Sequence, residues 1–323
     1  GTDHTEFYVA PEEARAVIPK LAAMYDEPFG DSSQIPTFLV SELARKHVTV
    51  ALSGDGGDEL FGGYNRYFWS RRLWRWLAPI PQPVRAGFGS LIRAISPDRW
   101  ENLYRGLSFA LPAVQRPGEQ MHKLAGLLAA KDPDAMYLGM VSLWQQPTEA
   151  VVGTVEPQTT LTDRSSWARL PDFTMRMMYL DLVTYLPDDI LTKVDRASMA
   201  VSLEARVPLL DHRLVEFAWT VPLSMKIKTE GEGKWLLRRV LDRYVPRELI
   251  DRPKMGFGVP LDSWLRGPLR EWAESLLDAQ RLKREGYFQP GPIRQRWTEH
   301  LSGKRNWQYA LWNVLMFQAW NER

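Results

Sequence analysis

The chain has 323 residues and no cysteine, and its 41 Lys and Arg against 39 Asp and Glu leave a formal net charge of +2. This balance gives no global signal for nucleic-acid or membrane binding. The lack of Cys excludes disulfides, thiolate metal sites and cysteine nucleophiles, so chemistry in this chain must use carboxylates, lysines or a bound metal. The length suits one large domain or two modest ones, and no apolar run reaches the roughly 18 residues of a membrane span.

The first fifth of the chain alternates between strand and helix patterns. Residues 5–10 predict a short strand, Pro11 opens a predicted helix that ends near Tyr25, and residues 36–46 predict a second helix. The β-branched run Val48–Leu52 predicts a strand buried on both faces. This order is typical of a parallel α/β sheet. Two strands are too few to form one, so we expect a truncated sheet or further strands outside this chain.

A glycine-rich turn that carries acids follows directly: Ser53-Gly54-Asp55-Gly56-Gly57-Asp58-Glu59. Glycines allow conformations that other residues avoid and let the backbone approach a ligand closely. Such a turn, at the carboxyl end of a strand in an open parallel sheet, is a typical ligand site. Its acids would repel a phosphate unless a cation intervenes, and Mg²⁺, which binds one or two carboxylates plus phosphate oxygens, is the natural candidate. The alternative is that Asp58 only caps the helix that begins there.

Most of the remaining chain predicts helices. Residues 67–77 form an aromatic, basic helix that either packs against its neighbours or, less commonly for such a pattern, lies on a membrane surface. Residues 79–170 predict helices broken by proline, and residues 264–323 predict a helical tail. The five His residues show no spacing typical of a metal site.

Residues with chemical potential return at Leu186. Leu186–Arg196 predicts the start of a helix with Asp188 and Asp189 in its first turn, continuing toward residues 204–211. In that later segment Glu204, Arg206 and Asp211 suit a structural ion-pair set as well as a catalytic one.

Two lysines follow in different settings. Lys234 falls within a predicted helix over residues 232–244. Lys254 lies on a predicted loop, residues 252–260, that Pro and Gly shape. A lysine on such a loop can be held over a phosphate, although a solvated surface lysine is the simpler interpretation.

Taken together and in this order, these blocks resemble those of the glutamine-dependent asparagine synthetases. The resemblance rests on Val50–Tyr64, Leu186–Asp195, Ser202–Asp211, Lys234 and Lys254, and it is weakest over residues 70–170. It implies an α/β fold, the adenine-nucleotide alpha-hydrolase-like (PP-loop ATP pyrophosphatase) synthetase domain, mostly helical in this chain with few parallel strands. The implied organisation is a remnant of the nucleotide-binding sheet at 1–70 and a mainly helical part at 71–323, with substrate- and phosphate-facing loops at 186–211 and 232–260.

The resemblance also implies a ligase of asparagine biosynthesis that uses ATP and Mg²⁺. Such an enzyme activates the side-chain carboxylate of aspartate as β-aspartyl-AMP with release of pyrophosphate, and ammonia from glutamine then gives asparagine and AMP. The implied setting is cytoplasmic, with an N-terminal glutaminase domain as partner, without nucleic acid or membrane, and with a homodimer left open. Two alternatives stay open: a related synthetase that amidates another carboxylate, such as a peptide or a sugar acid, and a non-catalytic scaffold.

Carried over residue by residue, the resemblance implies a set of site residues. The implied catalytic residues are Lys254, which neutralises charge during adenylation, and Asp55, which stands where relatives carry Glu or Tyr and whose role stays open. Asp58 matches a magnesium and pyrophosphate ligand. The implied ATP- and pyrophosphate-binding residues are Ser53, Gly54, Gly56, Lys234 and Lys254. The implied substrate-binding residues are Glu59, Asp188 and Lys193.

Two parts of the family pattern are absent from this sequence: the first nucleotide loop, Ser-Gly-Gly-x-Asp-Ser, and the glutaminase domain with its Cys nucleophile. We therefore expect the chain to be the C-terminal part of a synthetase, cut inside its nucleotide-binding sheet. We also expect these residues alone to be inactive in ATP–pyrophosphate exchange.

Overall fold

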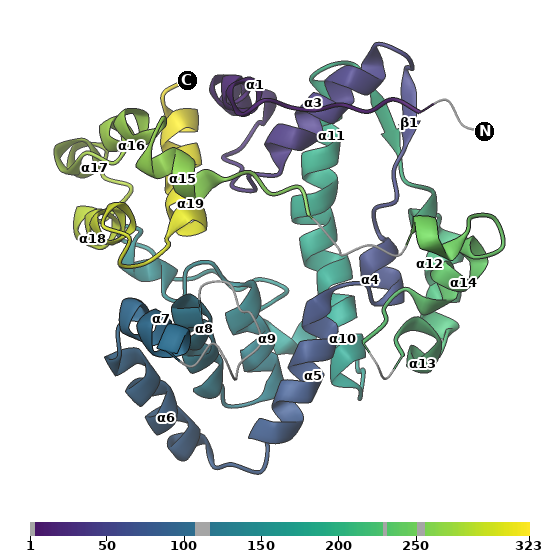
Figure 1. Ribbon diagram of the computed structural model, residues 1–323, viewed down its shortest axis with the longest axis horizontal. Helices are drawn as coiled ribbons and strands as arrows, with labels where there is room; N and C mark the ends of the chain where they lie inside the picture. Colours follow the sequence, from purple (N-terminus) through teal and green to yellow (C-terminus); the bar gives the residue numbers. More distant parts are fainter. Residues whose placement is uncertain (1–3, 107–116, 229–230, 251–255) are drawn as a thin grey trace.

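The computed structural model describes residues 4–106, 117–228, 231–250 and 256–323. This part of the chain is mostly helical and contains one two-stranded parallel sheet (Figure 1). Its helices are α1 Pro11–Ala16, α2 Ile18–Met24, α3 Gln34–Arg45, α4 Gly57–Phe61, α5 Asn65–Leu77, α6 Gln82–Ala94, α7 Pro97–Gly106, α8 Pro117–Leu128, α9 Pro133–Val141, α10 Phe173–Leu180, α11 Thr192–Met199, α12 His212–Thr220, α13 Leu223–Lys226, α14 Trp235–Leu241, α15 Leu261–Arg266, α16 Arg270–Leu276, α17 Ala279–Glu285, α18 Pro290–Leu301 and α19 Gln308–Asn321. Short 3₁₀ turns occupy Pro147–Glu149, Arg164–Ser166, Pro208–Leu210 and Arg247–Leu249.

The sheet joins two segments that are far apart in the sequence. Strand β1, Val50–Leu52, lies parallel to β2, Glu204–Arg206. The predicted strand at 48–52 is thus confirmed, but its burial on both faces is wrong, because Leu52 is 75% exposed. In the described part of the chain β1 pairs with β2 alone, so the other edge of β1 has no strand partner there.

The predicted helices are largely confirmed, with several shifts of boundary. The predicted helix at 11–25 is two helices, α1 and α2, and the one at 36–46 is α3. The proline-broken helices (α6 to α9) and the helical tail (α15 to α19) are present. The prediction of a strand at residues 5–10 is wrong, because within the described part of the chain that segment pairs with no strand.

The aromatic, basic helix α5 packs only in part. Tyr67 and Leu77 are buried, whereas Trp69 and Trp76 are 67% and 72% exposed. Within the described residues, no helix combines the length and the apolar character needed to cross a bilayer.

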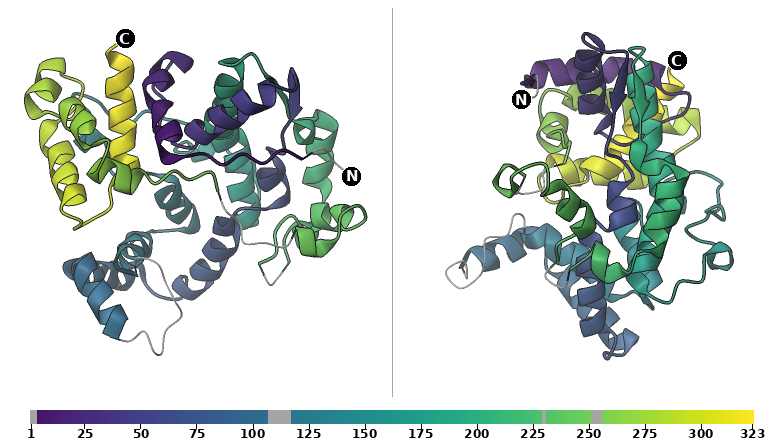
Figure 2. Two further views of the ribbon diagram at one scale, coloured as in Figure 1. Left: turned by 45° about the horizontal axis from the view of Figure 1, so that its top comes forward. Right: turned by 90° about the vertical axis from the view of Figure 1, so that its right-hand side faces the viewer.

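A long helical rod runs through the centre of the molecule (Figures 1 and 2). It consists of α10, a π-helical segment, Asp181–Leu191, and α11, without interruption. The rod begins at Asp172, whose side chain accepts hydrogen bonds from the backbone of Thr174 and Met175. The predicted helix start at Leu186 is therefore wrong. Pro187 lies inside the rod, where the wider π-helical turn accommodates a residue that lacks an N–H.

Three clusters of buried apolar side chains hold the helices together. The largest joins α1 to α3 with α15 to α19 and includes the fully buried Trp297 and Trp312. A second joins α5, α9 and α10 through Tyr67 and the methionines of α10. The third packs Leu60 and Phe61 of α4 against α12. The short helix that carries Asp58 is thereby fixed to its neighbours by its own apolar residues.

One buried side chain, that of Lys226, places an amine inside the protein. Lys226, at the end of α13, is 0% exposed, and its Nζ has no hydrogen-bond partner among the described residues. It lies 5.0 Å from the centroid of the Trp219 ring. Burial lowers the pKa of Lys226 from 10.5 to about 8.

We expect Lys226→Met to raise the free energy of unfolding near neutral pH by on the order of 1–3 kcal/mol, because it removes a buried ammonium. Between about pH 8 and 10.5 the unfolded chain binds more protons than the folded one, so wild-type stability rises with pH in that window. The gain should therefore shrink as the pH approaches 10.5. Urea unfolding at both ends of the window, with the exposed Lys283→Met as control, measures it. A gain that does not change with pH would contradict the burial argument.

Candidate functional site

The structure brings together Asp58 and Lys234, two residues that the family resemblance assigns to metal and phosphate binding. Lys234 Nζ lies 2.9 Å from Asp58 Oδ2, and the side chains are 31% and 23% exposed. Asp58 stands in the first turn of α4, and Lys234 directly precedes α14. The pair is thus partly open to solvent, at the carboxyl end of β1.

The backbone on both sides of this pair has unusual conformations. Gly56, immediately before α4, has φ +80°, as the glycine-rich turn predicts. Lys234 is also left-handed, with φ +55°, a conformation that costs a non-glycine residue about 1–3 kcal/mol. It is held there because its N–H donates to the carbonyl of Phe61 at 3.0 Å. Lys234 therefore precedes a helix and does not lie within one, which corrects the predicted helix at 232–244.

Gly63 is required by the closeness of the two side chains. A Cβ at this position would lie 2.0 Å from Asp58 Oδ1 and 2.4 Å from Lys234 Cε. The carboxylate and the ammonium therefore pack directly across the bare Cα of Gly63. Any side chain there would push the pair apart.

The donor set at this place fits a magnesium ion that phosphates help to hold. In the described ranges no three His, Cys, Asp or Glu side chains gather to bind a metal by themselves. Mg²⁺ commonly takes one or two carboxylates and completes its shell with phosphate oxygens and water. Asp58 offers such a carboxylate, and Gly56, which has no side chain, occupies the cap position of α4. The helix-cap interpretation of Asp58 is therefore wrong.

The other residues of the glycine turn lie at its exposed edge. The Ser53 hydroxyl donates to Asp55, and both side chains are half-buried. Gly54 is exposed, and a Cβ there would meet nothing within 4 Å. Asp55 is thus turned toward its own turn. Lys254, the other predicted catalytic residue, lies outside the described residues.

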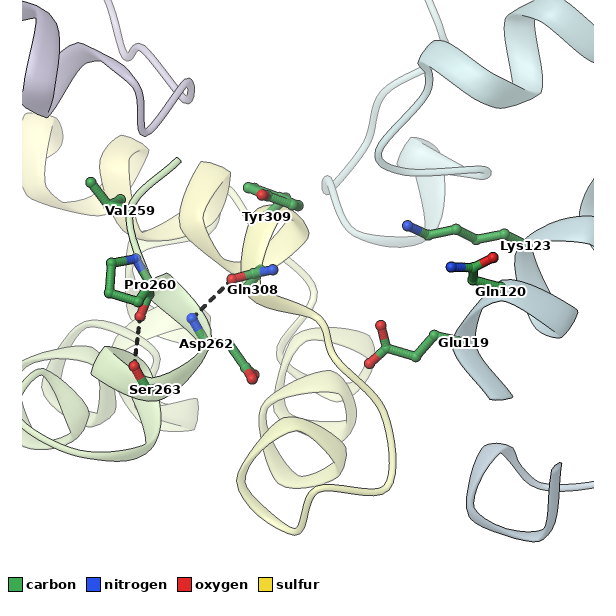
Figure 3. Close-up of a pocket in the computed structure, with 9 residues that line it drawn as sticks. All are labelled: Glu119, Gln120, Lys123, Val259, Pro260, Asp262, Ser263, Gln308 and Tyr309. Atoms are coloured by element: carbon green, nitrogen blue, oxygen red, sulfur yellow. Dashed lines mark hydrogen bonds between the residues drawn. The ribbon is translucent and has the colours of Figure 1, made fainter. Parts of the chain in front are cut away.

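The end of the predicted 252–260 loop borders a polar cavity of about 470 Å³ (Figure 3). Two hydrogen bonds fix this end to the helices: Ser263 Oγ donates to the Pro260 carbonyl at 3.0 Å, and the Asp262 N–H donates to Gln308 at 2.9 Å. The opposite wall consists of Glu119, Gln120 and Lys123 from α8. The segment that follows Lys254 is thus anchored at Pro260.

The three predicted substrate residues lie in different surroundings. Glu59 is buried, accepts a hydrogen bond of 2.6 Å from the Tyr64 hydroxyl, and has a pKa raised by burial. Lys193 is also buried. Asp188 is exposed on the rod, in the middle of the helix and not in its first turn.

A buried network around Asp181 was missed by the sequence analysis. Asp181 is 0% exposed and accepts hydrogen bonds from Tyr67 at 2.5 Å, Tyr137 at 2.7 Å and Arg66 at 2.9 Å. Arg66 in turn lies over the Tyr64 ring, 4.1 Å from its centroid. The network joins α5, α9 and the rod and leads to the Tyr64–Glu59 hydrogen bond beside Asp58. No local pattern could have revealed it.

A second polar cluster links the rod to the loop between α2 and α3, which carries Asp31. Lys193 Nζ lies 2.7 Å from Asp31 Oδ2. Burial alone would raise the pKa of Asp31, but the Lys193 ammonium and the hydrogen bonds from Ser33 together outweigh it and lower that pKa. Burial and the charge of Asp31 raise the pKa of Asp189 to about 7. Asp189 Oδ1 is buried and has no hydrogen-bond partner in the part of the chain that the structure describes.

We expect Asp189→Asn to stabilise the fold at about pH 8 by on the order of 1–3 kcal/mol, and much less at about pH 4. Between the usual pKa of 3.8 and about 7 the folded protein binds more protons than the unfolded chain, so wild-type stability falls as pH rises through this window. An amide stays neutral and avoids that loss. Urea unfolding at both pH values tests it, with the exposed Asp188→Asn as matched control. Equal effects of the two substitutions at high pH would contradict it.

Comparison with known proteins agrees with the family resemblance seen in the sequence. The family model described as asparagine synthase matches residues 1–322. The chain is 30% identical over 330 residues to asparagine synthetase [glutamine-hydrolyzing] 1 of Bacillus subtilis (strain 168), covering 99% of this chain and 48% of that protein. It is 34% identical over 333 residues to a putative asparagine synthetase [glutamine-hydrolyzing] of Mycobacterium tuberculosis (strain ATCC 25618 / H37Rv), covering 99% of this chain and 46% of that protein. A putative asparagine synthetase [glutamine-hydrolyzing] 2 of Methanocaldococcus jannaschii shares 57% identity over 63 residues, 20% of this chain and 12% of that protein.

The chain spans about half the length of the first two of these relatives. The family model, in contrast, covers it almost from end to end. The chain belongs to the asparagine synthase family.

Proposed function

We propose that the chain carries the ATP-dependent, amide-forming part of an asparagine synthetase. It activates the side-chain carboxylate of aspartate as β-aspartyl-AMP, releases pyrophosphate, and gives asparagine and AMP after attack by ammonia. The observation that carries the proposal is the Asp58–Lys234 pair across Gly63, in a chain of this family. A triphosphate that binds at the end of a parallel strand needs positive charge, and a carboxylate that can hold a cation, next to an ammonium, provides it.

In this scheme an oxygen of the aspartate side chain attacks the α-phosphorus, and the bond to the leaving pyrophosphate breaks. The nitrogen of ammonia then attacks the acyl carbon, and the bond to AMP breaks. Lys234 stabilises charge on the phosphates, and Asp58 would hold a Mg²⁺ ion. When bound, that ion would supply positive charge for the pyrophosphate. Lys254 neutralises charge during adenylation, and Asp55 is a candidate to accept a proton from ammonia.

The other expectations from the sequence extend this proposal. The turn atoms of Ser53, Gly54 and Gly56 bind the phosphates, and Glu59, Asp188 and Lys193 contribute to the aspartate site. The fold is of the PP-loop pyrophosphatase type. A glutaminase domain supplies ammonia from glutamine in the complete protein, in the cytoplasm.

The test is product formation by the complete protein with ATP, Mg²⁺, an ammonium salt and a panel of carboxylates. We expect AMP and the amide to form with aspartate. If AMP forms only with a peptide or a sugar acid, that carboxylate would be the substrate in place of aspartate, and the proposed chemistry would still hold. No AMP with any carboxylate would favour a scaffold.

Asp58→Asn in the complete protein is expected to lower activity and to shift its Mg²⁺ dependence to higher concentrations, because the amide binds the cation more weakly than the carboxylate. Activity titrated against Mg²⁺ measures the shift, and circular dichroism checks that the fold is kept. A titration curve that coincides with that of the wild type would show that Asp58 holds no metal.

A further inference from the structure

A large cavity, which neither Asp58 nor Lys234 lines, lies between α5, the start of α10 and α13. Its volume is about 710 Å³, within the range of small-molecule sites. One wall is the face of α5 that carries Phe68, Arg71, Arg72 and Arg75. The opposite wall includes Leu223 and Ile227, which lie at α13 and directly after it (Figure 1). The aromatic, basic pattern of α5 thus lines a cavity.

The cations of this cavity are not neutralised by the protein. Arg71, Arg72 and Arg75 form no ion pair with any carboxylate in the structure as described, whereas Arg66 on the same helix binds Asp181. The Lys228 ammonium, on the facing wall, forms no ion pair within the described residues and lies 3.9 Å from the centroid of the Trp235 ring. Like charges spaced four apart on a helix destabilise it. A bound anion would offset this repulsion.

The carboxylate that lines this cavity is already engaged. Among the described lining residues Asp172 alone is acidic, and its side chain accepts hydrogen bonds from Thr174 and Met175 at the start of α10. It does not neutralise the arginines across the cavity. The charge of the site is therefore positive on balance.

The same cavity offers an aromatic surface beside the cations. Trp69 lines the cavity and is 67% exposed, so its indole ring is available to stack against a flat group. Arginine forks bind phosphate in a bidentate manner, and aromatic rings bind planar rings. An acidic peptide would use the arginines but has no general need of a stacking ring.

We propose that this cavity is a binding site for a phosphorylated small molecule with a flat ring, the phosphate held by Arg72 and Arg75 and the ring stacked on Trp69. The site is separate from the glycine turn and does not depend on the proposed ligase activity. Because Lys228 and Gly231 line it shortly before Lys234 in the chain, a ligand here would touch the segment that leads to the Asp58–Lys234 pair.

Isothermal titration calorimetry tests this site, with AMP and with pyrophosphate as probes, at low salt with EDTA in place of Mg²⁺. Lys234→Ala is the background, so that binding at the glycine turn is suppressed. We expect AMP to bind with a dissociation constant below about 1 mM. Arg72→Gln/Arg75→Gln should weaken both probes by about tenfold or more, since it removes two charge-assisted contacts. Trp69→Ala should weaken AMP several-fold and leave pyrophosphate unchanged.

The control is Arg45→Gln/Arg99→Gln, which changes the net charge equally at exposed positions outside the cavity. Binding that this control weakens as much as Arg72→Gln/Arg75→Gln does would overturn the site, because it would reflect net charge alone. Unchanged AMP binding in Trp69→Ala would overturn the ring contact. A poly-glutamate peptide that binds the same arginines more tightly than AMP would replace the small molecule by an acidic polypeptide and overturn the proposal.

Discussion

Lys254→Ala is expected to lower the turnover number for adenylation by about a hundredfold or more, with a much smaller change in the KM for ATP. Negative charge builds on the α-phosphorus as pyrophosphate departs, and a fixed ammonium there acts mainly in the transition state. Loss of one such preorganised contact typically costs on the order of 10²–10³ in rate. The proline and glycine residues near Lys254 in the sequence suit such a placement.

Stopped-flow measurements on Lys254→Ala and Lys254→Arg at two salt concentrations separate this mechanism from a general surface charge. The larger, planar guanidinium should restore little of the rate. A surface charge would instead give a small effect that fades with added salt. Losses of less than tenfold in both variants would contradict the proposed role of Lys254, and the proposed glutaminase activity of the complete protein serves as the internal control.

Asp181→Ala is expected to lower the free energy of unfolding by about 3–5 kcal/mol. The substitution removes the buried carboxylate that Arg66, Tyr67 and Tyr137 share, and so leaves a charge and two hydroxyls without their acceptor. Breaking a buried pair costs more than the pair contributes, because the remaining partner stays desolvated. Chemical denaturation monitored by fluorescence measures the loss.

Two further variants make this prediction specific. Glu204→Ala breaks an exposed pair with Arg206, 2.7 Å apart, and should cost at most about 1 kcal/mol. The double substitution Asp181→Ala/Arg66→Met should recover part of the loss, since it also removes the stranded cation. A cost for Asp181→Ala no larger than that for Glu204→Ala would show that the buried network does not hold α5 to the rod.

Local patterns predicted the elements that have strong local signals. The β-branched run before the glycine turn predicted β1, and proline punctuation predicted α6 to α9. Strand β2 was missed because Glu204-Ala205-Arg206 has no β-type composition; it is a strand because it pairs with β1. A helix start was predicted at Leu186 because Asp188 and Asp189 suit a first turn, whereas the structure places both within a π-helical segment.

The polar interactions were predictable only in part. Asp58 and Lys234 were each assigned through resemblance to a family, since their own surroundings in the sequence also suited a helix cap and a surface lysine. Their contact needs two chain segments to meet at Gly63, which no periodicity encodes. The same holds for Asp181, whose partners come from α5 and α9. Asp188 and Asp189 are adjacent and of the same residue type, and only the burial of Asp189 beside Asp31 raises the pKa of its carboxyl group.

Transfer of oxygen from the substrate to AMP is the most direct test of the proposed chemistry. Aspartate labelled with oxygen-18 in its side-chain carboxylate is supplied to the complete protein with ATP, Mg²⁺ and ammonium, and the products are analysed by mass spectrometry. Attack of the carboxylate on the α-phosphorus predicts that AMP carries one labelled oxygen, because the carbon–oxygen bond breaks when ammonia displaces AMP. Label in inorganic phosphate with unlabelled nucleotide would show attack on the γ-phosphorus instead and would contradict the account.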